Sequence, residues 1–183
     1  MNKKILILTG SPRVSGNSRL MTDAFRKGAE EAGHDVTVIN TADEALDGCR
    51  HCDMCWTKGR ACAIDDGFTA ISEALNEADI LVFAAPMYWS QFPSYLKAPV
   101  DRFYAYTLPE NMKHQHVRKL AMLTCGDGED TSIFNSADAW CREIADFFSW
   151  EYAGYVGVPR LVGAGEVNDT DGLKKAYDFG KNI

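Results

Sequence analysis

The chain alternates between short apolar runs and amphipathic segments, which is the pattern of a parallel sheet covered by helices. The continuous apolar runs are typical of strands buried on both faces, and they lie at 4–9, 80–85 and 120–124. Two further strands are predicted at 35–39 and 152–158. Between the strands, apolar residues recur at helical spacing and predict helices at about 17–32, 68–75, 94–106, 133–148 and 173–180.

Five strands in this rhythm predict a three-layer α/β/α sandwich with a five-stranded parallel sheet, in the flavodoxin-like order 2-1-3-4-5. The 183 residues are the length of a single domain, and no internal repeat is present. Ligands of such sheets bind beyond the carboxyl ends of the strands, where this chain carries polar loops at 10–18, 86–91 and 124–130. An irregular stretch at 40–66 is long for a compact domain, and such loops are usually functional.

Composition and charge exclude several classes of protein. Hydrophobic residues make up 46% and charged residues 25%, which excludes a disordered or fibrous chain. The net charge of −7, without a block of Lys or Arg, argues against nucleic acid and anionic membranes as partners. The longest apolar run, 80–89, is shorter than the roughly 20 residues of a membrane span. The apolar N-terminal segment is too short for a signal peptide, so we expect a cytoplasmic protein with reduced thiols.

The first polar loop has the features of a phosphate-binding loop. Between a strand and a helix, residues 10–18 hold two glycines, three serines, an asparagine and Arg13. Hydroxyl and backbone N–H groups can donate to phosphate oxygens, and the helix start adds its positive dipole end. The patterns of nucleoside triphosphate and dinucleotide loops are absent, so a terminal monophosphate is the expected ligand. A capped helix start after a tight turn is an alternative interpretation of the same residues.

The second and third loops suit a flat heteroaromatic ring. Tyr88 and Trp89 follow the central strand and can stack on such a ring, although either side chain could instead complete the core. The Gly-rich loop at 124–130 allows close backbone approach to a ring edge, and a solvated turn explains it equally well. No cysteine is followed six positions later by Arg, which excludes the low-molecular-weight tyrosine phosphatases of the same fold class.

Together, the three loops resemble those of the flavodoxin-like NAD(P)H-dependent FMN reductases, a family that includes multimeric flavodoxins and iron–sulfur flavoproteins. The shared motifs are Gly-Ser-Pro-Arg-x-x-Gly-Asn-Ser at 10–18, Pro-Met-Tyr-Trp at 86–89 and Leu-Lys-Ala with Asp-Arg within 96–102. The resemblance covers about residues 4–126. It implies hydride transfer from NAD(P)H to bound FMN and electron delivery to a second acceptor. It also implies a homodimer or homotetramer.

The same resemblance implies an FMN site. The residues expected around the phosphate are Ser11, Arg13, Ser15, Gly16, Asn17 and Ser18. Those expected against the isoalloxazine ring are Pro86, Met87, Tyr88 and Trp89. Those expected at the far edge of the ring are Thr124, Cys125 and Gly126. Because the flavin carries the chemistry, no catalytic acid–base side chain is expected. One departure from the family pattern is Pro99, which is expected to disturb its helix.

Four cysteines lie in the long loop, at a spacing that resembles the compact motif of the iron–sulfur flavoproteins. They are Cys49, Cys52, Cys55 and Cys62. Three thiolates at this spacing can wrap one face of a 4Fe-4S cluster, and the fourth follows a few residues later. Structural zinc more often uses two separated Cys pairs. Reduced thiols or a redox-sensitive pair are the alternatives. Cys141 lies on the apolar face of its helix and is expected in the core.

Three functions are therefore carried forward. The leading one is an FMN-dependent NAD(P)H oxidoreductase with a small molecule or a redox protein as its electron acceptor. The second is an electron carrier with a 4Fe-4S cluster on the cysteine-rich segment at about 47–64. The third is a thiol-based redox or metal sensor. The sequence identifies neither the acceptor nor the choice between NADH and NADPH.

Overall fold

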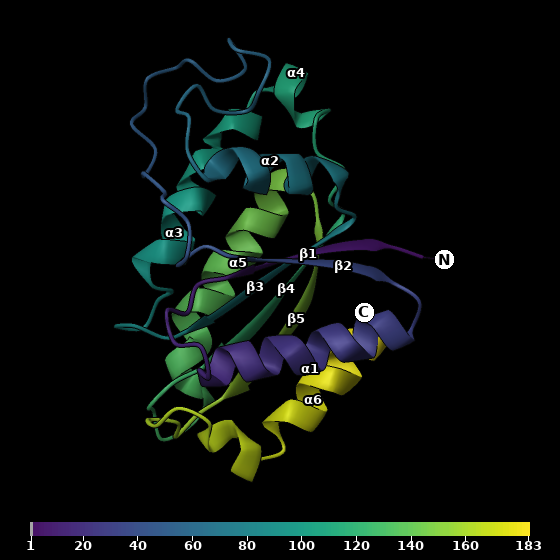
Figure 1. Cartoon of the computed structure of the whole chain (residues 1–183), viewed down its shortest axis with the longest axis vertical. Helices are drawn as coiled ribbons and strands as arrows, with labels where there is room; N and C mark the ends of the chain where they lie inside the picture. Colours follow the sequence, from purple (N-terminus) through teal and green to yellow (C-terminus); the bar gives the residue numbers. More distant parts are fainter. Residues whose placement is uncertain (1) are drawn as a thin grey trace.

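A computed structural model describes residues 2–183 and contains one parallel sheet with the strand order β2-β1-β3-β4-β5 (Figure 1). The strands are β1 (Lys4–Thr9), β2 (Asp35–Asn40), β3 (Ile80–Pro86), β4 (Lys119–Cys125) and β5 (Glu151–Val158). All four strand pairs are parallel. The strand order predicted from the sequence is therefore confirmed.

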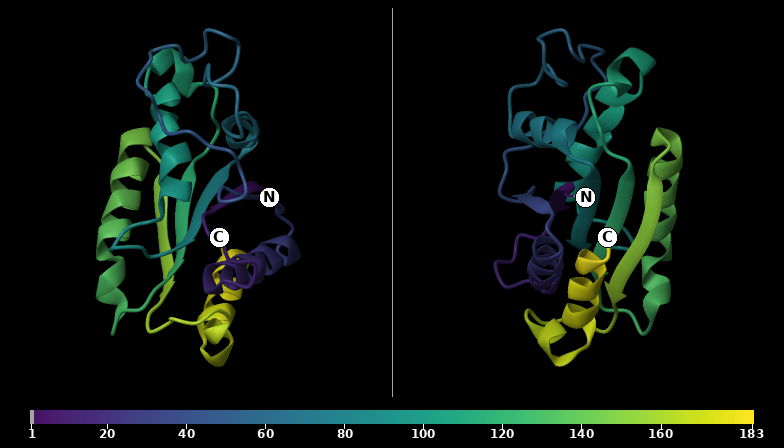
Figure 2. Two further views of the ribbon diagram at one scale, coloured as in Figure 1. Left: turned by 60° about the vertical axis from the view of Figure 1, so that its left-hand side comes forward. Right: turned by 90° about the vertical axis from the view of Figure 1, so that its right-hand side faces the viewer.

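Helices cover both faces of this sheet (Figures 1 and 2). The α-helices are α1 (Asn17–Glu31), α2 (Phe68–Glu77), α3 (Ser94–Asp101), α4 (Pro109–Met112), α5 (Asn135–Phe148) and α6 (Gly172–Lys181). The 3-10 helices are η1 (Arg102–Tyr106), η2 (Thr131–Phe134) and η3 (Glu166–Asp169). Alternate residues of β1 enter two separate cores: Leu6 and Leu8 pack with α2, α3 and α5, whereas Ile5 and Ile7 pack with α1 and α6. Burial on both faces is the reason that the strand runs are continuously apolar.

The C-terminal half of α1 packs closely against α6. A Cβ added to Gly28 would lie 2.1 Å from the Tyr177 carbonyl oxygen, and one added to Gly180 would lie 2.1 Å from the Phe25 carbonyl oxygen. The two helix backbones therefore touch, which only glycine permits at these positions. Gly33, just after α1, has a φ of +90°, as expected of the residue that ends a helix.

The helix predicted over 94–106 is divided in the structure. α3 ends at Asp101, and 3-10 turns follow from Arg102. Pro99 lies inside α3 and has no N–H to donate, so the helix is weakened shortly before the change of geometry. The helix predicted to begin at Ile133 instead has a 3-10 turn before α5, while α4 and η3 were not predicted. Within residues 2–183, no helix is both long enough and apolar enough to cross a bilayer.

A buried ion pair connects η1 to the irregular segment 47–66, here called the cysteine loop. Nη1 of Arg102 donates to both carboxylate oxygens of Asp66, at 2.8 and 2.6 Å, and to the Asp47 carbonyl oxygen at 3.2 Å. Nη2 reaches the Ile64 carbonyl oxygen at 3.5 Å, and the guanidinium lies 4.3 Å from the centre of the Phe68 ring. Because Asp47 and Ile64 are at opposite ends of the loop, Arg102 closes its neck.

The ion pair is held in its charged form. Burial raises the pKa of Asp66, but hydrogen bonds from Arg102 and from the backbone N–H groups of Asp47 and Phe68 outweigh this effect. The pKa of Asp66 in the folded chain is therefore below its ordinary value. A carboxylate of this kind stabilises the fold above its unfolded pKa of about 3.9, and this contribution is lost as the pH falls through the lowered pKa.

Replacing Asp66 by Ala should lower the free energy of unfolding at pH 7 by about 3–5 kcal/mol, because the Arg102 cation would be left buried without its partner. The measurement is urea unfolding at pH 7 and at decreasing pH, where the difference from wild type should narrow as Asp66 is protonated. Asp65→Ala is the matched control. It removes an exposed carboxylate paired with Arg60, for an expected cost of about 0–1 kcal/mol. An equal decrease in the free energy of unfolding in the two variants would contradict a stabilising role for the buried ion pair.

Candidate functional site

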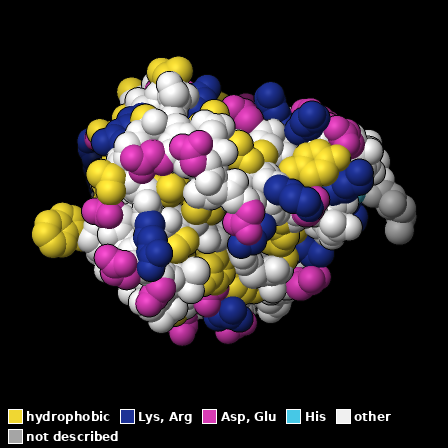
Figure 3. Space-filling model, turned by 90° about the horizontal axis from the view of Figure 1, so that it is seen from below, with side chains coloured by type: hydrophobic (Ala, Val, Ile, Leu, Met, Phe, Trp, Pro, Cys, Tyr) yellow, Lys and Arg dark blue, Asp and Glu magenta, His cyan; other side chains and the backbone are white. Residues whose placement is uncertain are grey.

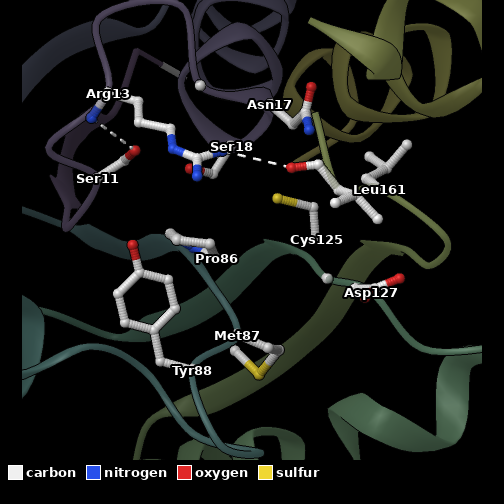
Figure 4. Close-up of a pocket in the computed structure, with 13 residues that line it drawn as sticks. Ser11, Arg13, Asn17, Ser18, Pro86, Met87, Tyr88, Cys125, Asp127 and Leu161 are labelled. Atoms are coloured by element: carbon white, nitrogen blue, oxygen red, sulfur yellow. Dashed lines mark hydrogen bonds between the residues drawn. The ribbon is translucent and has the colours of Figure 1, made fainter. Parts of the chain in front are cut away.

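Loops that follow four of the strands line one cavity of about 170 Å³ at the carboxyl edge of the sheet (Figure 4). Its lining residues are Ser11, Arg13, Gly16, Asn17, Ser18, Pro86, Met87, Tyr88, Cys125, Gly126, Asp127, Leu161 and Val162. β1 lies between β2 and β3 in the sheet, so the chain leaves β1 toward one side and later continues on the other. Ligand-binding crevices of doubly wound sheets lie at this reversal.

One end of the cavity is suited to an anion. It is formed by the start of α1, whose first N–H groups have no carbonyl partner within the helix. Ser11 and Ser18 are buried there, and Arg13 extends across to the loop after β5, with its Nη1 3.4 Å from the Val162 carbonyl oxygen. A Cβ at Gly16 would lie 2.8 Å from Ser11 Oγ and 3.1 Å from the Arg13 carbonyl oxygen, so a side chain at this position would crowd the turn. Hydroxyl groups, a guanidinium and a helix dipole thus converge in a small space.

Asn17 connects this loop to the segment that follows β5. Its Nδ2 donates to the Gly163 carbonyl oxygen at 2.8 Å, and its Oδ1 accepts a hydrogen bond from the Val167 N–H at 3.2 Å. Both ends of the amide are therefore engaged within the chain. In this arrangement Asn17 positions the cavity wall with its side chain and leaves its backbone N–H for a ligand.

The other end of the cavity has an apolar wall made by Pro86, Met87 and Tyr88 (Figure 4). Tyr88 and Gln91 exchange two backbone hydrogen bonds, of 2.7 and 3.1 Å, around a two-residue turn. The turn residues Trp89 and Ser90 have φ values of 51° and 62°, as a type I′ turn requires. Trp89 lies at the tip of this turn and is fully exposed, outside the lining of the cavity.

Cys125 contributes a neutral group to the cavity. Burial raises the pKa of the Cys125 thiol to about 12, although the Ser18 backbone N–H and the Arg13 charge act in the opposite direction. At neutral pH the thiol is therefore protonated and does not repel an anion bound near Arg13. The neighbouring Thr124 is fully buried, and its hydroxyl donates to the Ala85 carbonyl oxygen at 2.9 Å, which supports the floor of the cavity from behind.

The structure brings together the residues predicted for the flavin site, except for three that lie outside the lining. These are Ser15, Trp89 and Thr124. Three lining residues were missed from the sequence, namely Asp127, Leu161 and Val162. The last two belong to the loop after β5. Its position after a parallel strand at the same edge was the signal that could have identified them.

The four clustered cysteines border a second, much smaller cavity, of about 20 Å³, together with Arg102 and Tyr104 of η1. Burial raises the pKa of Cys55, and the nearby sulfurs of Cys62, Cys49 and Cys52 raise it further. All four are free thiols. Within residues 2–183, no three His, Cys, Asp or Glu side chains converge to hold a single metal ion. The sulfurs thus surround a space without meeting at one point.

The cysteine loop has an unusual backbone and lies far from the first cavity. His51, Asp53 and Trp56 all have positive φ values, between 48° and 62°, and such a concentration of left-handed residues is typical of functional segments. The Trp56 indole N–H donates to the Ala105 carbonyl oxygen at 2.8 Å and holds the loop on η1. In Figures 1 and 2 the loop lies at the top of the molecule, away from the loops that line the larger cavity.

Residues 3–136 match the model of the NADPH-dependent FMN reductase family. The chain belongs to this family. It is therefore a flavin-dependent oxidoreductase, as the motif resemblance predicted. Among its relatives, an iron–sulfur flavoprotein of Archaeoglobus fulgidus is 27% identical over 98% of this chain and 78% of that protein. An iron–sulfur flavoprotein of Methanosarcina thermophila is 33% identical over 54% of this chain and 51% of that protein.

Solved structures share the fold of this reductase at low sequence identity. An NAD(P)H:quinone oxidoreductase from Methanothermobacter marburgensis has a TM-score of 0.79 and 20% identity, covering 100% of this chain and 97% of that one. An FMN-dependent NADH-azoreductase from Bacillus anthracis, solved in complex with FMN, has a TM-score of 0.69 and 15% identity, covering 98% of each chain. These likenesses confirm the flavodoxin-like fold of the reductase.

Proposed function

We propose that this reductase holds FMN in the cavity at the carboxyl edge of the sheet and uses it to pass electrons from NAD(P)H to a second acceptor. The observation that carries the proposal is the pairing, in one cavity, of an anion-binding helix start with an apolar wall. FMN has this same division between a phosphate and a flat ring. Bound flavin would supply the hydride and electron chemistry, while the chain binds and orients it.

In this proposal, Arg13, Ser11 and Ser18 hold the phosphate together with the N–H groups at the start of α1. The buried hydroxyls donate hydrogen bonds, and Arg13 neutralises charge at the mouth of the cavity. Met87 and Tyr88 would lie against the ring. The protonated Cys125 thiol leaves the phosphate end free of competing negative charge.

We propose that a second copy of the chain covers the mouth of the cavity in a homodimer or homotetramer. Apolar side chains around the mouth are exposed: Val14 by 82%, Val162 by 64% and Trp89 by 101%. Figure 3 shows the lower face of the molecule, where apolar side chains lie among charged ones of both signs. Exposed apolar groups beside a ligand cavity are typical of a surface that another protein covers.

The cysteine loop is proposed to hold a 4Fe-4S cluster through Cys49, Cys52, Cys55 and Cys62. Four free thiols border one cavity, and thiolates are the ligands of such clusters. A cubane cluster is larger than the space between the sulfurs, so the loop would move outward to take it. Cys49 and Cys52 lie on the exposed side, which leaves room for that movement. Several relatives carry the name iron–sulfur flavoprotein.

The reductase activity is tested by adding NADPH or NADH, without oxygen, to the FMN-loaded protein. We expect the visible absorption of oxidised flavin to disappear with at least one of the two nucleotides and to return when an electron acceptor such as a quinone is added. Full retention of the oxidised spectrum with both nucleotides would favour an electron carrier that receives its electrons from another protein.

The phosphate assignment is tested by reversing the charge of Arg13. Arg13→Glu should weaken FMN binding about 10- to 100-fold, the equivalent of one lost charge-assisted hydrogen bond of about 1.5–3 kcal/mol. Riboflavin, which lacks the phosphate, should lose little affinity. The measurement is quenching of flavin fluorescence on titration with protein. Arg26→Glu, the same change at an exposed position of α1 outside the cavity, should bind FMN as wild type does. Equal weakening of FMN and riboflavin by Arg13→Glu would contradict the assignment.

Cys52→Ser should remove most of the iron and sulfide from protein purified without oxygen, because one of four cluster ligands is lost. FMN content should stay unchanged, since the two cavities share no lining residue. His51→Ala is the control, because it changes the neighbouring exposed side chain and leaves all four thiols in place. Iron, sulfide and FMN are measured on the same samples. A Cys52→Ser protein with wild-type iron content would contradict the ligand set.

A further inference from the structure

We propose that Arg102 acts as a positioning residue that raises the reduction potential of the cluster by presenting a buried positive charge to its sulfur ligands. The inference rests on the iron–sulfur site proposed above. It concerns a side chain that supplies no ligand and lies on a different element from the cysteines.

The first observation is an unused donor. The Arg102 side chain is 1% exposed, and it lines the small cavity together with the four cysteines. Its Nη atoms reach Asp66, Asp47 and Ile64, but its buried Nε has no hydrogen-bond partner within residues 2–183. A buried donor without a partner is costly and is rarely left so in a native protein. A sulfur-rich anionic group in the adjoining cavity is a partner that this donor could reach.

The second observation is the orientation of the ion pair. Arg102 borders the cavity, whereas its partner Asp66 does not, so the positive end of the pair faces the sulfurs. A guanidinium is not deprotonated in proteins, and this one is also paired with the Asp66 carboxylate. Arg102 therefore keeps its charge at every working pH.

The effect on the cluster follows from charge. Reduction adds one electron, supplied by the reductant, and no bond is formed or broken. The negative charge of the cluster and its four thiolates rises by one, and a nearby cation stabilises this reduced form more than the oxidised form. Hydrogen bonds to the sulfurs and the net charge around them are among the factors that set such potentials. Arg102 supplies a hydrogen-bond donor and a positive charge. The negative charge of Asp66, which does not border the cavity, partly offsets that positive charge.

The experiment uses variants that change the charge in opposite directions. Asp66→Asn removes the negative partner and leaves Arg102 charged. The double variant Arg102→Gln with Asp66→Asn removes both charges but keeps amide groups that can bond to each other. Asp65→Asn is the control, because this neighbouring carboxylate is exposed and pairs with Arg60. Each full-length protein is reconstituted with ferrous iron and sulfide without oxygen, analysed for iron and sulfide, and titrated with dithionite against the cluster absorbance.

We expect Asp66→Asn to raise the equilibrium constant for one-electron reduction about tenfold, which is about 59 mV for this couple, and the double variant to lower it by a similar factor. Asp65→Asn should match wild type. A purely structural role of Arg102, acting through a loosened loop neck, would move the two test variants in the same direction. That result, or unchanged potentials in both, would overturn the inference.

The iron and sulfide analysis separates this inference from the proposal beneath it. A wild-type protein that takes up no iron and sulfide would refute the iron–sulfur site itself, before Arg102 is considered. If only the double variant fails to assemble a cluster, the reduction potential of the Asp66→Asn protein decides whether Arg102 tunes the cluster. A potential that does not rise in that variant overturns the role of Arg102.

Discussion

The architecture depends on one constraint, the burial of a parallel sheet on both faces. The strands β1, β3 and β4 are buried along almost their whole length, so polar side chains of the strand connections gather where these strands end. Because all strands point the same way, loops from β1, β3, β4 and β5 meet at a single edge. The reversal of strand order beside β1 opens the space between them. The exposed N–H groups at the start of α1 and the apolar wall meet in one cavity because of this arrangement.

A second centre is built on different elements. The cysteine loop leaves the sheet after β2 and is held on η1 by the Arg102–Asp66 pair and by the Trp56 indole. It shares no lining residue with the larger cavity. The fold of an FMN reductase thus carries a long segment that is attached to η1 by the Arg102–Asp66 pair, the Trp56 indole and the Tyr104–Asp53 hydrogen bond. The Arg102 cation closes the loop neck and also borders the space between the thiols.

Family membership and geometry support each other at different levels. The family match covers the β1 loop, the β3 loop and the cysteine loop, and it establishes a flavin-dependent oxidoreductase. The geometry shows which side chains converge on the cavity. It also shows which of them have their polar groups hydrogen-bonded within the protein. Asn17 is an example: it belongs to the motif of the first loop, yet its amide is engaged with Gly163 and Val167. The loop after β5 lies beyond the family match and completes the cavity wall.

Apolar periodicity was sufficient to predict the sheet, its order and the polar loops at its edge, because burial on two faces leaves a local signature in β1, β3 and β4. Motif spacing was sufficient to indicate the flavin loops and the cysteine cluster. Other features depended on a local turn that the apolar pattern does not reveal, or on contacts between residues far apart in the chain. Trp89 turned outward because the Tyr88–Gln91 hydrogen bonds fold a tight turn. Leu161 and Val162 joined the site through β5 pairing, and Arg102 became buried because Asp66, 36 residues away, compensates its charge. Local sequence carries burial patterns, whereas long-range partners are decided only when the chain folds.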